Sequence, residues 1–254
     1  MITLADTHAH LCDAAFDGDR DEVLARAAAA GISAVLAVGE TLEDAERNLA
    51  LAARHPMIRP AAGLYPEHLD LGLAERMRAF VRSHRDRMAA IGEVGLDYWI
   101  VRDESAREIQ RGIFRGFIEL GKETGLPVNV HSRSAGRHAV GLLLESGAVK
   151  VQMHAFDGKL SAAMPAAEAG YFFSIPPSVV RSEQKRKLAK HLPLSCLLLE
   201  SDSPVLGPDP KERNEPANAL LALRCVAELR GISPEEAART IAENTRRLYG
   251  DSLS

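Results

Sequence analysis

The sequence predicts an α/β fold in which eight parallel strands, each followed by a helix, close into a (β/α)8 or TIM barrel. Short apolar runs of strand length recur eight times along the chain, and segments with helix punctuation separate them. The length of 254 residues suits one such barrel. A count of eight strands favours the closed barrel over an open doubly wound sheet. The sequence contains no obvious linker, low-complexity tract or internal repeat, so we expect residues 1–254 to form a single domain.

The expected strands are short, and several are apolar along almost their whole length. This pattern is typical of parallel strands that are covered on both faces. In chain order they are residues 2–6, 33–38, 58–63, 88–94, 127–131, 149–154, 170–175 and 195–200.

Helix boundaries are marked by capping residues and glycines between these runs. Three pairs resemble capping boxes, in which a short polar side chain precedes an acidic one by three residues: Asp19 with Glu22, Ser105 with Glu108, and Ser233 with Glu236. Pro234 stands at the first helical position of the last helix. Four glycines mark expected helix ends: Gly31, Gly125, Gly147 and Gly231.

Composition and charge exclude several classes of protein. A formal charge of −4 argues against broad electrostatic attraction to nucleic acid or anionic lipid. The three cysteines (Cys12, Cys196 and Cys225) are scattered, and we expect them to be buried, reduced thiols. The chain has no apolar stretch long enough for a membrane span, and its first residues lack the features of a signal peptide. We therefore expect a cytoplasmic protein with no membrane contact and no obligate protein partner.

The first candidate site is the segment Asp6-Thr7-His8-Ala9-His10, at the end of the first expected strand. In an extended chain alternate side chains face the same way, so His8 and His10 can point together toward the barrel axis. Two adjacent imidazoles suit a transition-metal ion. Taken alone, the pair is equally compatible with two polar loop residues.

Four further candidate ligands lie at the ends of other expected strands. Glu93, His131 and His154 end the fourth, fifth and sixth strands, and Asp202 follows the eighth. A lone residue of this kind is more often structural. In a barrel, however, all the carboxyl ends of the strands meet at one mouth, so these side chains would converge with the histidine pair. The set predicts a metal site at that mouth.

These residues belong to longer motifs that resemble a known family. The motifs are DTHAHL, AIGEVGLDY, LPVNVHSRSAGR, HAFDG, GYFFSIPPS, LPL, ESDSPVLGP, RNEP and the C-terminal N-x-x-R-L. Nearly end to end, the chain resembles the TatD family of metal-dependent deoxyribonucleases within the amidohydrolase superfamily. It is most similar to the branch that includes the third human TatD-domain protein. The resemblance implies hydrolysis of DNA phosphodiester bonds.

The resemblance also implies how the ligands are shared between two divalent metal ions, which in such families are zinc, magnesium or manganese. His8, His10 and Asp202 would hold the first ion, and His131 and His154 the second. Glu93 would bridge the two and is counted with Asp202 as catalytic.

One departure from the family pattern concerns the substrate. Members commonly have G-x-H-P after the third strand, whereas this chain has Gly63-Leu64-Tyr65-Pro66, with His68 shortly after. If the family's histidine assists the substrate phosphate, either Tyr65 or His68 must replace it or activity is reduced. The missing histidine is not among the implied metal ligands.

The expected chemistry follows from two metals close together. Two carboxylates contribute about −2 against about +4 from the ions, which creates a local positive field in an acidic protein. Ions roughly 3.5–4 Å apart would share a hydroxide that attacks the phosphorus. We hypothesise that Asp202 both binds a metal and accepts the proton of the attacking water; the alternative is that it is a ligand only.

Several cations and aromatic residues lie just past strand ends, where they would meet substrate. Arg133 and Arg213 are candidate phosphate contacts, as are Lys159 and Arg181. For each, a solvated surface cation is the alternative. The run from Arg181 through residues 185–187 is interpreted as a solvated helix face. Tyr98 and Trp99 are candidates to stack a nucleobase, with packing at the rim as the alternative.

Three functions remain open at this stage. The first is a metal-dependent deoxyribonuclease whose partner is DNA or a nucleotide. The second is an amidohydrolase-type enzyme that cleaves a lactone or C–N bond, because related barrels use similar metal clusters and the fold alone does not choose the substrate. The third is a non-catalytic metal-binding protein, which is disfavoured because every ligand position of the motif is present.

Overall fold

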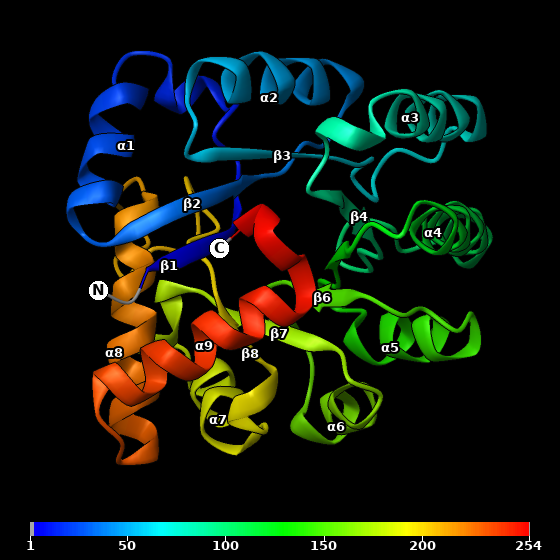
Figure 1. The fold of residues 1–254 in the computed structure, drawn as a ribbon. Coiled ribbons are helices and arrows are strands. Elements are labelled where there is room, and N and C mark those ends of the chain that lie inside the picture. Colours follow the sequence, from blue (N-terminus) through cyan, green and yellow to red (C-terminus); the bar gives the residue numbers. More distant parts are fainter. Residues whose placement is uncertain (1–2, 254) are drawn as a thin grey trace.

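The computed structural model describes residues 3–253 and contains one sheet of eight parallel strands in the order β1 to β8. Helices surround the sheet on its outer side (Figure 1), so the predicted α/β barrel is confirmed. The strands are β1 (Leu4–Ala9), β2 (Ile32–Ala37), β3 (Ile58–Ala62), β4 (Ala90–Gly95), β5 (Val128–His131), β6 (Val151–Met153), β7 (Phe172–Ile175) and β8 (Leu197–Leu199). Each of them overlaps an expected strand.

The first strand lies further along the chain than its apolar run suggested. The expected strand was 2–6, of which residue 2 lies outside the described part, whereas β1 runs from Leu4 to Ala9. All six residues of β1 are buried, including three polar ones, Asp6, Thr7 and His8. These polar side chains make hydrogen bonds inside the barrel. A prediction from apolar runs does not detect buried polar residues, so it ended the strand too early.

Nine α-helices are present in residues 3–253, and most of them follow a strand. They are α1 (Arg20–Ala29), α2 (Leu42–Arg54), α3 (Leu71–Ser83), α4 (Glu104–Thr124), α5 (Gly136–Glu145), α6 (Leu160–Glu168), α7 (Glu183–His191), α8 (Ala219–Arg230) and α9 (Pro234–Tyr249). Short 3-10 helices lie between them: η1 (Ala14–Phe16), η2 (Arg85–Arg87), η3 (Pro177–Val180), η4 (Leu194–Cys196), η5 (Pro216–Asn218) and η6 (Gly250–Leu253).

The expected helix punctuation is confirmed in part. Ser233 caps α9 by accepting a hydrogen bond from the Glu236 amide, and Gly125 and Gly231 end α4 and α8 in the left-handed conformation. Gly31 and Gly147 follow α1 and α5 with positive φ.

Two expected caps are wrong in detail. Asp103, not Ser105, caps α4, because the helix begins two residues earlier than expected. Asp19 stands at the N-cap of α1 but makes no capping hydrogen bond. Its carboxylate instead binds the Arg213 guanidinium, with Nη1 donating to Oδ1 at 2.7 Å. The Arg213 guanidinium, distant in sequence, thus takes the place of the backbone amide that a capping carboxylate would bind.

The first and last strands are joined near the mouth by hydrogen bonds that involve polar groups of β1. The Thr7 hydroxyl donates to the Leu199 carbonyl at 2.8 Å, and the Ser201 amide donates to Asp6 Oδ1 at 2.8 Å. The Asp202 amide donates to the His8 carbonyl at 2.9 Å. The segment after β8 is thereby held against the segment that carries the histidine pair.

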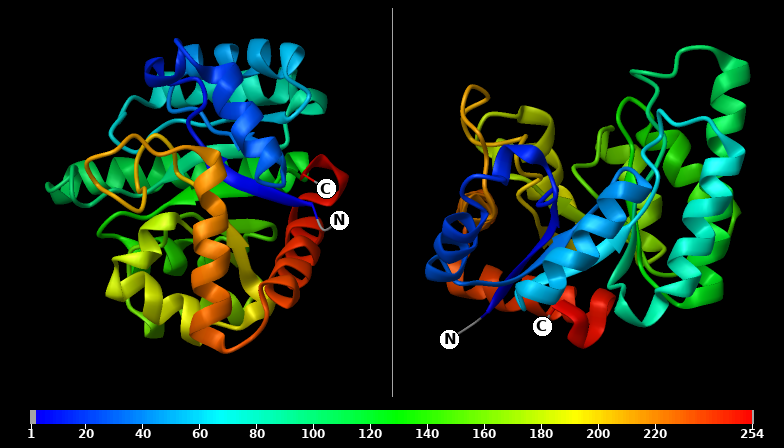
Figure 2. Two further views of the ribbon diagram at one scale, coloured as in Figure 1. Left: turned by 90° about the vertical axis from the view of Figure 1, so that its left-hand side faces the viewer. Right: turned by 90° about the horizontal axis from the view of Figure 1, so that it is seen from above.

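Two apolar clusters stabilise the barrel. The larger lies between strands and helices, where side chains such as Phe114, Phe117 and Met77 are fully buried. The smaller includes inward-facing residues of several strands together with Tyr249 of α9 and Leu253 of η6. Figure 2 shows the C-terminal segment lying across the end of the barrel near the start of β1, opposite the mouth where the strands end.

The three cysteines match the expectation, and the described helices are not suited to span a membrane. Cys12, Cys196 and Cys225 are buried free thiols, and burial raises the pKa of Cys12 to about 12. Within residues 3–253, no helix combines the length and the hydropathy required to cross a bilayer.

Candidate metal centre

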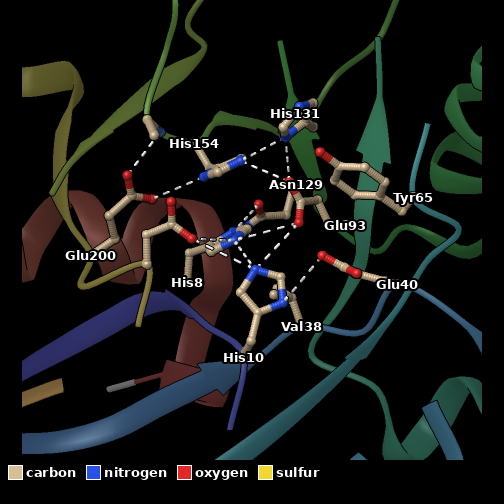
Figure 3. Close-up of polar contacts among 12 residues, drawn as sticks. His8, His10, Val38, Glu40, Tyr65, Glu93, Asn129, His131, His154 and Glu200 are labelled. Carbon is tan, nitrogen blue, oxygen red and sulfur yellow. Dashed lines mark hydrogen bonds and ion pairs between the residues drawn. The ribbon is translucent and has the colours of Figure 1, made fainter. Parts of the chain in front are cut away.

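The six candidate ligands, which come from five different strands, converge at the carboxyl-end mouth of the barrel. They are His8 in β1, His10 directly after it, Glu93 in β4, His131 at the end of β5, His154 after β6 and Asp202 after β8. Figure 3 labels His8, His10, Glu93, His131 and His154. Their donor atoms form overlapping groups within 4.8 Å of one another. Barrel closure therefore brings together residues that are scattered through the sequence.

The Glu93 carboxylate lies at the centre and presents one oxygen to each side. Oε1 lies 2.5 Å from His131 Nδ1 and 2.8 Å from His154 Nε2. Oε2 lies 3.4 Å from His10 Nε2 and 3.8 Å from His8 Nε2. One carboxylate thus stands between two pairs of imidazoles.

Asp202 completes the side that contains the first histidine pair. Its Oδ1 lies 3.5 Å from His8 Nε2 and 3.6 Å from His10 Nε2, and the two Nε2 atoms are 3.3 Å apart. The His8 ring also stacks on His154 at 3.8 Å between centroids. The two sides of the cluster are therefore in direct contact.

Buried polar neighbours fix the orientation of two of the imidazoles. The Asn129 amide donates to the Thr7 carbonyl at 3.0 Å, which leaves its Oδ1 to accept from His8 Nδ1 at 2.8 Å. His131 Nε2 lies 3.1 Å from Asp97 Oδ2 and donates a hydrogen bond to this carboxylate oxygen. Nε2 of His8 and Nδ1 of His131 therefore face the centre of the cluster, the orientation that metal-binding imidazoles require.

The third orienting group is Glu200, next to His154. Its Oε2 lies 3.7 Å from His154 Nδ1, a buried nitrogen without a hydrogen-bond partner within residues 3–253. The carboxylate is held by the Ser174 hydroxyl at 2.6 Å and the Ala155 amide at 2.8 Å. A small shift of His154 would convert this contact into a hydrogen bond.

Burial and mutual proximity displace the protonation equilibria of the cluster. Burial, together with neighbouring His154, lowers the pKa of His8 to about 3, so this imidazole is neutral at pH 7. For His10 burial acts in the same direction, but the nearby carboxylates of Asp202 and Glu93 outweigh it and raise the pKa to about 9. Burial also opposes ionisation of Glu93, yet the imidazoles of His154 and His131 hold its pKa well below the usual range. An ionised carboxylate therefore lies among the imidazoles at the centre of the cluster.

Two glycines allow the backbone to approach Glu93 and His131 closely. A Cβ at Gly95, where φ is +148°, would lie 2.1 Å from the His131 carbonyl oxygen. A Cβ at Gly63 would lie 2.4 Å from the Glu93 carbonyl oxygen. Both positions require glycine, because larger residues would push apart the strands that carry the ligands.

A cavity of about 430 Å³ opens above the cluster, and two of the predicted substrate contacts line it. Tyr65 and Arg133 line it. The Tyr65 hydroxyl donates to Asp97 Oδ2 at 3.1 Å, and the same oxygen contacts His131 Nε2. Lys185 also lines the cavity, with Nζ 3.2 Å from the Ala155 carbonyl, although the sequence pattern was interpreted as a solvated face.

The other candidate contacts are placed elsewhere. His68 is not among the residues that line this cavity and lies beside Glu67 at the surface. Arg213 pairs with Asp19 and lies over the Phe16 ring at 4.9 Å. Arg181 donates to the Gly207 carbonyl, and Lys159 lines a separate groove beside α7. Tyr98 is buried, whereas Trp99 is 54% exposed.

Sequence reasoning missed the residues that orient the ligands. Asp97, Asn129 and Glu200 carry no recognisable metal-ligand spacing, although each lies within four residues of a candidate ligand near a strand end. Their strand-end positions were the available signal. Lys185 was missed because its sequence neighbours are also charged. The position of α7 in the fold is what places this lysine, among those cations, at the cavity.

Comparison with known proteins agrees with this geometry. Residues 5–250 match the family described as TatD related DNase. The human protein named deoxyribonuclease TATDN3 is 43% identical over 98% of this chain and 95% of its own length. A Bacillus subtilis protein described as the uncharacterized metal-dependent hydrolase YabD is 33% identical over 97% of this chain and 98% of its own length.

A solved structure shows the same fold. The Escherichia coli TatD homologue YJJV matches with a TM-score of 0.89 and 28% identity, over 98% of this chain and 99% of that one. The sequence relatives, the shared fold and the buried cluster of histidines and carboxylates, which is consistent with a divalent-metal site, lead to one assignment. The chain belongs to the TatD family of metal-dependent hydrolases.

Proposed function

We propose that this protein is a deoxyribonuclease that hydrolyses DNA phosphodiester bonds with two divalent metal ions, zinc, magnesium or manganese. His8, His10 and Asp202 would hold one ion, His131 and His154 the other, with Glu93 between them. The observation that carries this proposal is the Glu93 carboxylate, whose two oxygens face two separate histidine pairs.

The donor set fits such ions. Imidazole nitrogens and carboxylate oxygens suit first-row divalent metals, and the orienting bonds from Asn129 and Asp97 are of the kind that support metal-binding histidines. When bound, such ions supply Lewis acidity and lower the pKa of a coordinated water.

The chain's own residues would perform the remaining steps. Asp202, which is 5% exposed and lines the cavity, would accept the proton of the attacking water. Arg133 and Lys185 line the same cavity and would bind the non-bridging phosphate oxygens. The burial of His8 and Glu93 keeps bulk water away from the donor atoms.

Two lining cations favour an anionic phosphoester over the neutral carbonyl substrates of the amidohydrolase alternative. An anionic phosphoester would pair with the charges of Arg133 and Lys185, whereas a lactone or amide would not. The choice of DNA among phosphoesters rests on the name of the human relative.

The decisive experiment incubates the purified, metal-loaded protein with labelled single- and double-stranded DNA, alongside lactone and amide panels. We expect DNA cleavage that is lost in the His131→Ala, His154→Ala double variant. DNA cleavage that persists undiminished in that variant would come from a contaminating nuclease and overturn the assignment.

Asp202→Asn tests the proton-transfer role separately. Turnover should fall to less than about a tenth of the parent rate, while metal content, measured by elemental analysis, falls only modestly. Turnover above that level would leave Asp202 as a ligand only.

A further inference from the structure

The turn after β4 presents an aromatic ring at the same mouth as the metal cluster. Trp99 is the single tryptophan of the sequence, and it is 54% exposed. The neighbouring Ile100 is 43% exposed. Scattered exposed apolar residues are ordinary on protein surfaces, so exposure alone assigns no role. The contacts of this turn with the site carry the argument.

Asp97 ties the turn to the metal cluster. Its Oδ1 accepts hydrogen bonds from the amides of Trp99 and Ile100 at 2.9 and 3.0 Å. Its Oδ2 contacts His131 Nε2 and the Tyr65 hydroxyl, each at 3.1 Å. One fully buried carboxylate therefore fixes both the indole turn and a metal-binding imidazole. The turn that carries the ring is therefore held at a set position relative to the cluster.

Arg133 connects the ring with the cavity. Its guanidinium carbon lies 5.2 Å from the Trp99 ring centroid, and the residue also lines the cavity above the cluster. The Arg133 carbonyl accepts from the Tyr98 amide at 3.0 Å, so the loops after β4 and β5 are joined. A second cation, Arg102, lies 5.9 Å from the same ring. An aromatic face bordered by cations matches the stacked bases and anionic backbone of a nucleic acid strand.

We propose that Trp99 is a stacking site for one unpaired nucleobase next to the scissile phosphodiester, with Arg133 binding the phosphate between that base and the metal cluster. This inference rests on the proposed function and names its substrate class as a strand with an unpaired base. Inside a duplex both faces of each base are covered by neighbours, so Trp99 favours single strands, frayed ends or extruded bases over intact duplex.

The single tryptophan makes binding directly observable. Metal-loaded protein is mixed with oligothymidylate in a stopped-flow fluorimeter, so that indole emission is recorded before cleavage. The matched probe is a strand of equal length in which every base is replaced by an abasic site, with the same phosphates. We expect saturable quenching with oligothymidylate and none with the abasic strand. Equal quenching by both strands overturns the proposal. An oligouridylate arm distinguishes DNA from RNA as the source of the base.

Affinity measurements with variants provide a second test. Binding of labelled strands is followed by anisotropy, and Trp99→Leu should weaken oligothymidylate binding roughly tenfold, whereas Trp99→Phe retains most of it. Affinity for the abasic strand should be unchanged, as should all affinities of the control Ile100→Ala. Unaltered oligothymidylate affinity in Trp99→Leu contradicts the stacking role. Base-dependent quenching without cleavage of any strand would instead reject the proposed hydrolase function and leave the stacking site intact.

Discussion

At the scale of single residues, Tyr65 stands where the family commonly has a histidine. Its hydroxyl bonds to Asp97, whose same oxygen contacts His131, and its ring lies 5.0 Å from the His131 ring. Tyr65 therefore acts on the metal cluster through Asp97, in addition to bordering the cavity. The substitution changes the support of a ligand and leaves the ligand set intact.

Tyr65→Phe should weaken metal binding without removing it. Loss of the hydroxyl leaves Asp97 with one donor fewer at Oδ2, and such supporting bonds are worth about 10- to 100-fold in metal affinity. Titration calorimetry with Zn²⁺ or Mn²⁺ should show a loss of about tenfold in the affinity of one site. His68→Ala, which changes a residue outside the cavity, is the control. Unchanged affinity in Tyr65→Phe would assign the tyrosine to substrate alone.

Lys185 should impose an alkaline limit on substrate binding. Burial lowers the pKa of its ammonium below the usual value, although Glu200 and Asp202 oppose this. The group is a cation below its pKa, so the phosphate contact weakens as pH rises through that lowered pKa. KM for DNA should therefore rise on the alkaline side. Lys185→Arg should move that rise to higher pH, because guanidinium remains protonated.

Lys187 offers the matched control for this measurement. It lies on the same helix but pairs with Glu183 at the surface at 2.8 Å. Lys187→Arg should leave the pH profile of KM unchanged. A profile that is the same in wild type, Lys185→Arg and Lys187→Arg would show that Lys185 does not contact the phosphate.

At the scale of elements, β4 depends on glycine where it meets β5. A side chain at Gly95 would collide with the His131 carbonyl, and φ there is +148°. Gly95→Ala should displace β5 with its ligand, reduce the free energy of unfolding by more than about 2 kcal/mol and abolish stoichiometric metal binding.

Gly112 in α4 provides the opposite case. A Cβ there meets nothing within 4 Å, and the helical backbone suits alanine. Gly112→Ala should stabilise the protein by up to about 1 kcal/mol in urea denaturation and leave metal content unchanged. If Gly95→Ala and Gly112→Ala change the free energy of unfolding in the same direction, the close approach to the His131 carbonyl is not the reason why position 95 requires glycine.

At the scale of the whole molecule, the metal ions should bind only the folded barrel, because barrel closure assembles the ligands. At a free concentration 1,000 times Kd, such binding contributes about 4.1 kcal/mol to stability. For a domain of this size the melting temperature should rise by roughly 8–16 °C. Scanning calorimetry with and without added Zn²⁺ measures the shift. The His131→Ala, His154→Ala variant should lose most of it, and an equal shift in that variant would place the metal elsewhere.

The local information in the sequence determined the elements and the identity of the candidate ligands. Apolar runs marked all eight strands, since burial on both faces requires such runs. Short-range caps such as Ser233 and the positive-φ stops at Gly125 and Gly231 were readable because their partners lie within a few residues. The candidate ligands could be predicted to converge because strand ends of a parallel barrel meet at one mouth.

Only the tertiary structure decided which groups support those ligands and which cations face the cavity. Asp97, just after β4, reaches His131 of the neighbouring β5, whereas Asn129 of β5 reaches His8 of β1 across the barrel. Arg213 binds Asp19, which lies 194 positions away in the sequence. Each of these contacts depends on the rotation of a side chain and the register between strands, neither of which leaves a periodic pattern in sequence. The helices and strands follow from interactions between residues close in sequence. The hydrogen bonds that orient the candidate ligands join residues that come together only when the barrel closes.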